Sequence, residues 1–268
     1  MSQKTKMMSS EYQTALEQLL FQLADDDFLY SFRNSEWLGL APHIEEDVAS
    51  SSIAQDSMGH AAMFYGLLQD LGAGKADDLA HARPAPERKN CIIVERINGP
   101  GSYMENAQYD WAYAVVRNYF YTQAKKIKMD ALRQSSYPPL AQVAVKANME
   151  IYYHLLHWRT WFAQLLTSTD EAKSRMKEAF KKVWDDFGDM FSFGIHEQPI
   201  KKHKLIDGDL EAQWRAALEL VCASVGLKMP DTFKKSHYNG RNGVHTSELD
   251  GALATLSEVY NSNPMAAW

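Results

Sequence analysis

Cysteine is scarce in this chain, with only Cys91 and Cys222 among 268 residues. Two cysteines are too few for a disulfide framework, and neither has a His or Cys neighbour at the spacing of a redox motif. We therefore expect both thiols to be buried and unreactive. The chain also does not open with a charged segment followed by an apolar one, as a secretory signal does, so a reducing, cytoplasmic location is expected.

Long apolar runs and clustered positive charge are missing as well. No apolar run approaches the roughly 20 residues that a membrane-spanning helix needs. The formal net charge of −6 and the pI near 5.8 provide no basic footprint for nucleic acid or for an anionic membrane, so neither partner is expected. Phosphate-cradling glycine loops and Gly-x-Ser-x-Gly elbows are also missing, which argues against nucleotide-binding folds and serine hydrolases.

What the chain does contain is helical periodicity. Hydrophobic residues make up 46% of the sequence and aromatic residues 12%, enough to bury a sizeable core. Apolar residues at helical spacing predict four long helices, over residues 11–42, about 45–72, about 102–136 and about 140–168. Shorter helices are predicted over about 169–191, 212–227 and 247–260, with a loop over 194–209.

Residues 73–101 differ in character, because they are rich in Pro and Gly and include the strand-like stretch CIIVERI. This part of the chain is predicted to form a long crossover. Two long helices, a long crossover and two more long helices are the connectivity of a ferritin-like four-helix bundle. The sequence therefore predicts a single all-α domain over 1–268, with a core bundle over about 11–168 and accessory helices over about 170–260.

A di-iron site in such a bundle takes one Glu from each of two helices and a Glu-x-x-His pair from each of the other two. In the second helix His60 is present, but Ser57 stands where the carboxylate should be, and Asp56 is rotated from that position by about 100°. The fourth helix offers Glu150 and His154 at a spacing of four rather than three. Both pairs are therefore out of register for a di-iron site.

The other two helices offer still less. From 111 to 129 the third helix contains no Asp or Glu, so its middle cannot donate a carboxylate. The first helix has the run Asp25-Asp26-Asp27, in which Asp26 or Asp27 can turn inward, although such a run is also typical of a solvated face. If metal is bound, its candidate ligands are Asp26, Asp27, Asp56, His60, Glu150 and His154.

The same residues also permit an interpretation without metal. His60 is then a buried histidine bonded to Asp26, Asp27 or Asp56. Glu150 and His154 either form an ion pair within one helix, because residues four apart lie on the same face, or belong to a polar network in the core. Since the carboxylates are too few for two iron ions, we expect no metal, no other cofactor and no catalytic residue in this chain.

Two segments carry a family resemblance: RNSEWLGLAP (33–42) and HYNGRNGVHTSELDGALATLSEVY (237–260), together with the terminal Trp268. With the second and fourth helices, they resemble the C subunits of bacterial phenylacetyl-CoA epoxidases, which are multicomponent monooxygenases of phenylacetate catabolism. The resemblance extends over nearly the whole chain. It implies a structural subunit that pairs with a catalytic subunit, and it is the catalytic subunit that holds the di-iron centre and binds the acyl-CoA.

Three functions are left open by the sequence. The first is this structural subunit, whose isolated chain would expose an apolar partner surface and form a homodimer. The second is a metalloprotein that binds iron through the out-of-register ligands, with a π-bulge restoring their facing. The third is a storage or ligand-binding bundle with an apolar cavity lined by aromatic residues. The ligand count and the resemblance both favour the structural subunit.

Overall fold

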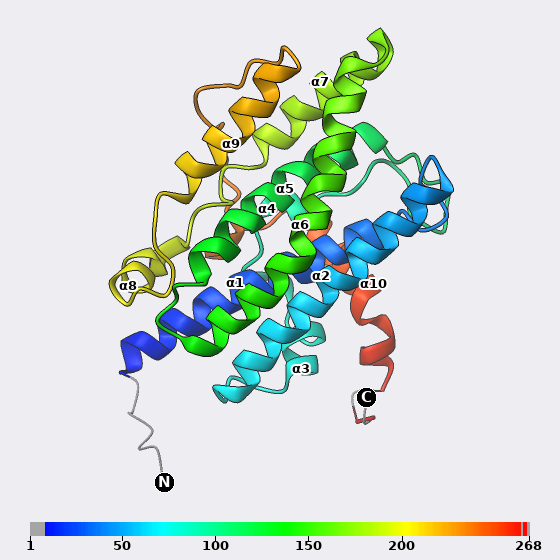
Figure 1. Cartoon of the computed structure of the whole chain (residues 1–268). Helices are drawn as coiled ribbons and strands as arrows, with labels where there is room; N and C mark the ends of the chain where they lie inside the picture. The colour runs from blue at the N-terminus through cyan, green and yellow to red at the C-terminus, as the bar shows by residue number, and fades with distance from the viewer. Residues whose placement is uncertain (1–8, 264, 267–268) are drawn as a thin grey trace.

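The computed structural model describes residues 9–263 and 265–266, and these form an all-α fold (Figure 1). Trp268 lies outside the described residues. Four long helices make up the bundle: α1 (Ser10–Ser35), α2 (Ile44–Asp70), α5 (Trp111–Leu132) and α6 (Pro138–Thr167). Helix α1 packs along α2, and α5 packs along α6. With the long connection between α2 and α5, this is the predicted ferritin-like arrangement.

Local sequence signals fix where several helices begin. The side chains of Ser9, Asp110 and Thr169 accept backbone N–H groups from the first turns of α1, α5 and α7 (Asp170–Asp185), respectively. Such caps satisfy donors that have no partner inside the helix. Pro138 is the first residue of α6, where its missing N–H costs no hydrogen bond. The bundle helices therefore start at residues that suit helix N-termini.

The crossover between α2 and α5 contains the short helices α3 (Ala76–His81), η1 (Ala85–Glu87) and α4 (Ile92–Glu95). Helix α4 occupies the stretch that the sequence predicted to be strand-like, so that prediction is wrong. In the described part of the chain, β pairing is limited to isolated bridges. Residues 92–94 are all buried, so their apolar character reflects burial of a short helix rather than a strand.

Two of the predicted long helices are shorter than expected. Helix α1 ends at Ser35 and is followed by turns. Helix α5 begins at Trp111 instead of about 102, because the preceding residues fold back on themselves. There the N–H of Gln108 donates to the carbonyl of Pro100 at 2.8 Å. Gly99 makes this close approach possible, since a Cβ at that position would lie 2.3 Å from the Gln108 carbonyl oxygen.

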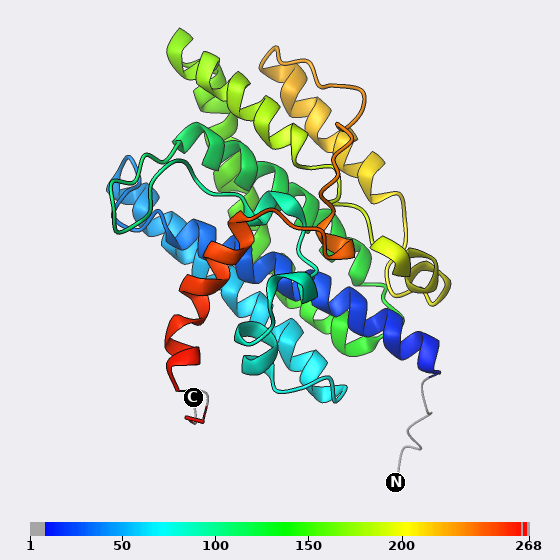
Figure 2. The same cartoon turned by 180° about the vertical axis from the view of Figure 1, so that it is seen from behind.

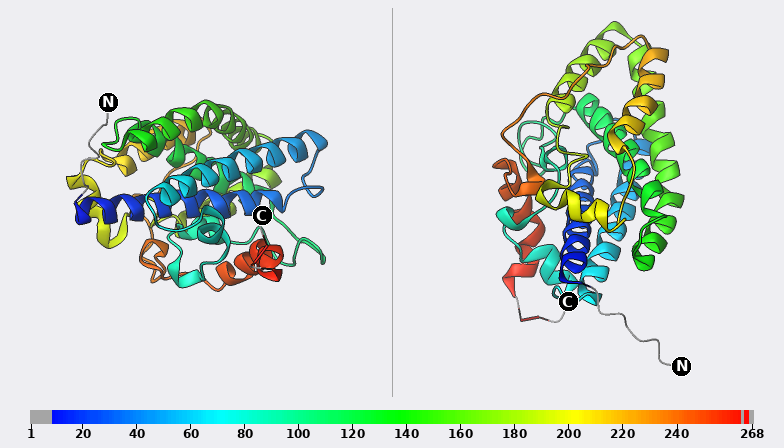
Figure 3. Two further views of the ribbon diagram at one scale, coloured as in Figure 1. Left: turned by 90° about the horizontal axis from the view of Figure 1, so that it is seen from below. Right: turned by 90° about the vertical axis from the view of Figure 1, so that its left-hand side faces the viewer.

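The remaining helices pack outside the bundle (Figures 2 and 3). Helices α7 and α9 (Leu210–Ser224) pack against α5, whereas α10 (Glu248–Ser262) packs against α1, α3 and α4. Helix α7 ends at Asp185, earlier than predicted, and α8 (Glu197–Lys202) and η2 (Gly194–His196) occupy part of the predicted loop. The short helix η3 (Gly240–Asn242) precedes α10.

Both cysteines are buried, as the sequence predicted. Cys91 and Cys222 are both free and buried, and burial raises the pKa of Cys222 to about 12, so neither thiol ionises readily. Among the described residues, no helix combines the length and the apolar character that crossing a bilayer requires.

Candidate functional site

Three consecutive aspartates of α1 lie in the interior of the protein. Asp25, Asp26 and Asp27 are 0%, 3% and 1% exposed. The interpretation of this run as a solvated face is therefore wrong. Successive residues of a helix are rotated by about 100°, so the three carboxylates point to three different sets of partners.

Asp27 points into the centre of the bundle, where it belongs to a network to which each of the four long helices contributes. Lys125 of α5 places its Nζ 2.7 Å from Oδ1 of Asp27 and 2.8 Å from Nδ1 of His60 on α2. The other ring nitrogen of His60, Nε2, lies 2.7 Å from Oε2 of Glu150 on α6. Tyr121 donates its hydroxyl to Oδ1 of Asp27 at 2.6 Å. We call four of these residues the central chain: Asp27, Lys125, His60 and Glu150.

The charges of the central chain fix the tautomer of its histidine. Burial, together with the neighbouring charge of Lys125, lowers the pKa of His60 to about 2, so the ring is neutral. An ammonium group has only hydrogen atoms to offer, so Nδ1 must accept from Lys125. The proton of the neutral ring then resides on Nε2 and is donated to the carboxylate of Glu150. The imidazole thus connects a buried cation to a carboxylate at the edge of the bundle.

These contacts correct two pairings predicted from the sequence, but they agree with the alternative prediction that Glu150 belongs to a polar network in the core. His60 is bonded to Lys125 and Glu150, and not to Asp26, Asp27 or Asp56. Glu150 does not pair with His154 on its own helix.

His154 instead has its partner across the seam between α2 and α6. Its Nε2 lies 2.9 Å from Oδ2 of Asp56. Burial lowers the pKa of His154 to about 4, despite the opposing effect of its bond to Asp56. A groove of about 350 Å³ opens beside the pair and is lined by Asp56, Glu150, Tyr153, His154 and His157, among others. The side chains of Asp56 and Glu150 are each 37% exposed there, so the seam connects the central chain to the surface.

The residues at the bundle centre do not fit a di-iron site. Lys125 has no lone pair to give a metal, and its ammonium lies between the two nearest candidate ligands, Asp27 and His60. The hollow remaining beside it has a volume of about 10 Å³, roughly the space of one water molecule. Both α2 and α6 are continuous α-helices, so neither contains the π-bulge that would restore the register of Asp56 or Glu150.

Asp26, another candidate metal ligand, is held by the C-terminal part of the chain. Arg241 in η3 binds both of its carboxylate oxygens, with contacts of 2.8 and 2.7 Å. The backbone N–H of Cys91 also donates to Asp26, at 2.7 Å. Lys128 approaches to 3.8 Å, and burial lowers the pKa of this lysine to about 8. Asp26 therefore belongs to a buried ion cluster separate from the central chain.

Asp25 organises the crossover in a similar way. Its carboxylate accepts hydrogen bonds from Arg83, from the Tyr65 hydroxyl at 2.6 Å and from the Lys89 backbone N–H at 2.8 Å. Arg88, which is fully buried, approaches it to 3.4 Å. Burial favours the protonated form of Asp25, but the two guanidinium groups outweigh it and lower the pKa.

The two segments that resemble the family, 33–42 and 237–260, form hydrogen bonds with buried polar residues. Trp37 donates its indole N–H to Oδ1 of Asn98 at 3.1 Å, and Asn98 donates to the carbonyl of Arg33 at 2.7 Å. Near the other end, His245 Nδ1 lies 2.7 Å from Oε2 of the fully buried Glu95. Trp37 and His245, one from each segment, thus form hydrogen bonds to residues of the crossover, Asn98 and Glu95.

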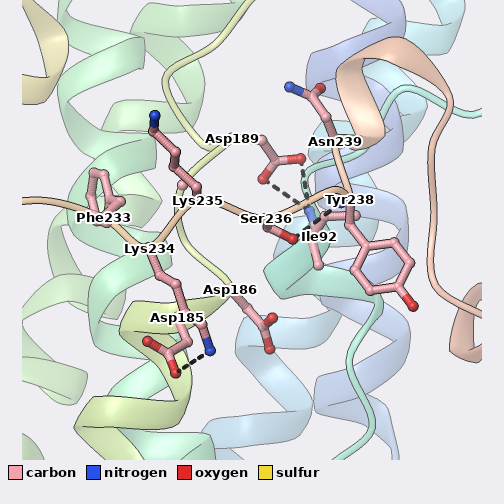
Figure 4. Close-up of a pocket in the computed structure, with 11 residues that line it drawn as sticks. Ile92, Asp185, Asp186, Asp189, Phe233, Lys234, Lys235, Ser236, Tyr238 and Asn239 are labelled. Carbon is pink, nitrogen blue, oxygen red and sulfur yellow. Dashed lines mark hydrogen bonds and ion pairs between the residues drawn. The ribbon is translucent and has the colours of Figure 1, made fainter.

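A second hollow, of about 260 Å³, lies between α4, the end of α7 and the loop before η3 (Figure 4). Its acidic residues already have partners. Arg96 binds both carboxylate oxygens of Asp186 at 2.8 and 2.9 Å. Asp189 accepts the backbone N–H groups of Ile92, at 3.2 Å, and Gly240, at 2.9 Å, while burial raises its pKa to about 6. These acids therefore serve to fasten the loop to α4 and α7.

Lys125, Lys128 and Arg241 are the site residues that the sequence analysis missed. A signal for the lysines was present, because Tyr121, Lys125 and Lys128 recur at intervals of four and three and so share one face of α5. That face turns out to be the one against α1 and α2. No local signal identified Arg241 as the partner of Asp26.

The whole chain, residues 1–268, matches a family model described as phenylacetic acid catabolic protein. The chain is also similar to the C subunit of the 1,2-phenylacetyl-CoA epoxidase of Escherichia coli strain K12. The two are 28% identical over 250 residues, which cover 92% of this chain and 96% of that protein. The resemblance inferred from the sequence is thereby confirmed.

Proposed function

The chain belongs to the family of phenylacetic acid catabolic proteins, and we propose that it is a non-catalytic, structural subunit of a multicomponent phenylacetyl-CoA ring epoxidase. Its similarity to the C subunit of such an epoxidase over most of both chains supports this assignment. In this proposal the di-iron centre and the acyl-CoA site belong to a separate catalytic subunit. This chain carries no metal or other cofactor and holds the complex together.

The observation that carries the proposal is the Lys125 ammonium at the centre of the bundle. Activation of dioxygen at a carboxylate-bridged di-iron centre needs about four carboxylates to balance two cations. Here a protein cation is already paired with Asp27, and both ring nitrogens of His60 are taken, by Lys125 and Glu150. The central chain is therefore arranged for stability, and none of its four side chains is free for redox chemistry.

We propose that the partner binds an exposed apolar face of α6. Five exposed apolar residues recur along it at helical spacing, and each is between 44% and 69% exposed: Val145, Met149, Tyr152, Tyr153 and Leu156. Ile44 and Val48 extend apolar exposure to the start of α2. We call these seven residues the α2/α6 face. Contiguous exposed apolar side chains of this kind are typical of protein interfaces, and aromatic residues are enriched there. We assign this face to the catalytic subunit and, in the isolated chain, to a homodimer.

The alternative of a storage or ligand-binding bundle has less support. It requires aromatic residues to line a cavity, whereas the rings in the interior pack on one another. Phe120, for example, contacts Trp214 edge to face with ring centres 5.4 Å apart, and Phe187 stacks on Trp214 at 4.8 Å. These rings fill the space between α5, α7 and α9.

The test is reconstitution with the catalytic and reductase subunits of the same system. We expect the isolated chain to oxidise no phenylacetyl-CoA, and we expect the catalytic subunit to lose activity or solubility without it. Tyr153→Asp combined with Met149→Asp should weaken the complex at least tenfold, because two charges would be buried at the interface. Leu220→Asp on α9, at a position 76% exposed and away from this face, is the matched control.

Two results would refute parts of this proposal. Ring epoxidation by the isolated chain supplied with iron and reductant would refute the structural role. Equal binding by the double variant and by Leu220→Asp would refute the assignment of the α2/α6 face. The oligomeric state of the isolated chain, measured by analytical ultracentrifugation, tests the homodimer separately.

A further inference from the structure

We infer that Lys125 is a built-in cation that takes the place of a metal ion, and that this one side chain prevents the bundle centre from binding a single divalent transition-metal ion. The inference concerns the isolated chain and does not rest on the proposed function. The site considered is not a di-iron site, because it would hold one metal ion, with Asp27 and His60 as ligands.

The geometry around Nζ of Lys125 is the first argument. Asp27 Oδ1 and His60 Nδ1 both lie within 2.8 Å of this nitrogen, so an acceptor oxygen and an acceptor nitrogen converge on one point. Ligand distances to Zn²⁺ or similar ions are about 2.0–2.2 Å for these atom types. The two ligands would therefore move inward by roughly 0.6 Å each to bind an ion at the position of the ammonium.

The groups behind these two ligands are the second argument. Metal-bound histidines usually donate their other ring N–H to a carboxylate, which fixes the tautomer. Glu150 already fills this role at Nε2 of His60, at 2.7 Å. The tautomer with Nδ1 free to accept is the one that the central chain imposes. Tyr121 restrains Asp27 in the same manner through its hydroxyl, at 2.6 Å.

Burial and charge are the third argument. Asp27 is 1% exposed and His60 is fully buried, so an uncompensated carboxylate there is costly. Lys125 is the cation nearest to Asp27, whereas Lys128 lies one turn later and approaches Asp26, which Arg241 already binds. Removing the Lys125 ammonium leaves a buried anion and a neutral imidazole facing the vacated space. A divalent cation would satisfy both.

The experiment replaces the lysine by a third ligand in the full-length chain. Lys125→Glu and the shorter Lys125→Asp each exchange a cation for a carboxylate beside Asp27 and His60. The matched control is Lys128→Glu, at a lysine of equal 4% exposure on the same helix. Co²⁺ is the probe, because its visible absorption reports coordination directly. Binding is followed by isothermal titration calorimetry, by the Co²⁺ spectrum and by the melting temperature.

We expect the Lys125→Glu or Lys125→Asp protein to bind about one Co²⁺ at least a hundredfold more tightly than the unchanged chain does. The ion should raise the melting temperature of that variant, since it binds the folded state. Adding His60→Ala should abolish binding. The unchanged chain and Lys128→Glu should show neither a Co²⁺ spectrum nor a shift in melting temperature.

Two outcomes would overturn the inference. One is His60-dependent Co²⁺ binding by the unchanged chain at the affinity of the variants, because Lys125 would then exclude nothing. The other is the absence of tighter binding in every Lys125 variant that folds. The variant Lys125→Gln is included in case the acidic variants do not fold, because it removes the positive charge without adding a negative one. We expect it to bind Co²⁺ at least tenfold more tightly than the unchanged chain, and equal affinity would count against the inference.

Discussion

Lys125 and His60 meet in the middle of the bundle with Nζ and Nδ1 2.8 Å apart, so a buried ammonium donates to a neutral imidazole. In a metal-binding bundle the same kind of histidine would give its lone pair to the ion. Here the lone pair goes to a lysine of α5, the helix whose middle has no carboxylate. The positive charge of the centre is therefore part of the polypeptide and is present as soon as the four helices pack together.

The Lys125–Asp27 pair makes a strong prediction for stability. Lys125→Met removes the cation and leaves Asp27 buried without its ion-pair partner, so we expect a loss of about 3–5 kcal/mol in the free energy of unfolding. Lys126→Met is the control, because the neighbouring lysine forms a partly exposed pair with Asp130 and should lose less than about 1 kcal/mol. Urea unfolding of both variants measures the difference. Equal losses would contradict the central role of Lys125.

The Arg241–Asp26 pair predicts that the C-terminal segment contributes to the stability of the whole fold. Arg241→Met removes a bidentate partner from a buried carboxylate, and we expect a loss of about 3 kcal/mol or more. Residues 237–245 should become susceptible to limited proteolysis in the variant. Arg215→Met, which breaks a partly exposed pair with Glu211, should leave the cleavage pattern unchanged. An unchanged pattern in both variants would contradict this prediction.

The buried imidazoles predict a loss of stability in mild acid. The pKa is lowered to about 2 for His60 and to about 4 for His154, chiefly by burial. Below about pH 6.5 these rings become protonated in the unfolded chain but stay neutral in the folded chain. The free energy of unfolding therefore decreases as the pH is lowered. Between pH 7 and pH 5 we expect a loss of about 1–2 kcal/mol for each ring. His154→Gln should remove one ring's share from this slope, and urea unfolding at several pH values gives the comparison.

Two glycines offer a matched pair with opposite expected effects. A Cβ at Gly240 would lie 1.9 Å from the carbonyl oxygen of Asn90, so Gly240→Ala should destabilise the fold by at least about 2 kcal/mol. At Gly59, within α2, a Cβ would meet no atom within 4 Å. Gly59→Ala should therefore stabilise the protein by up to about 1 kcal/mol. Thermal unfolding distinguishes the two, and a stabilising effect of Gly240→Ala would contradict the packing seen around η3.

Much of the fold is predictable from sequence because helical periodicity is a local signal. The apolar pattern of 140–168 predicted α6 to within two residues at its start. The start of α5 was predicted too early, because residues 102–110 are aromatic and polar in a helix-compatible way. A helix does not form there because the chain folds back at Gly99. The backbone of Gly99 then lies against that of Gln108, and these two residues are nine positions apart in the sequence.

The polar interior was harder to predict, since each carboxylate depends on a cation from another part of the chain. Asp25, Asp26 and Asp27 look alike in sequence, and nothing local reveals that all three are buried. Residues such as His60 and Glu150 were identified as interior polar groups, but their partners lie on other helices. The pairing is a property of the assembled bundle, and a pattern within one helix does not encode it.

The distance along the chain between Asp26 and Arg241 also matters while the protein is being made. The two residues are 215 positions apart, so at about 5–20 residues per second the ribosome needs roughly 10–40 s to add the arginine after the aspartate. During that interval the end of α1 and all of α2, α5 and α6 are synthesised, yet the carboxylate of Asp26 lacks its guanidinium partner. A nascent chain interrupted before η3 therefore contains every helix of the bundle but leaves the buried carboxylate of Asp26 without its guanidinium partner.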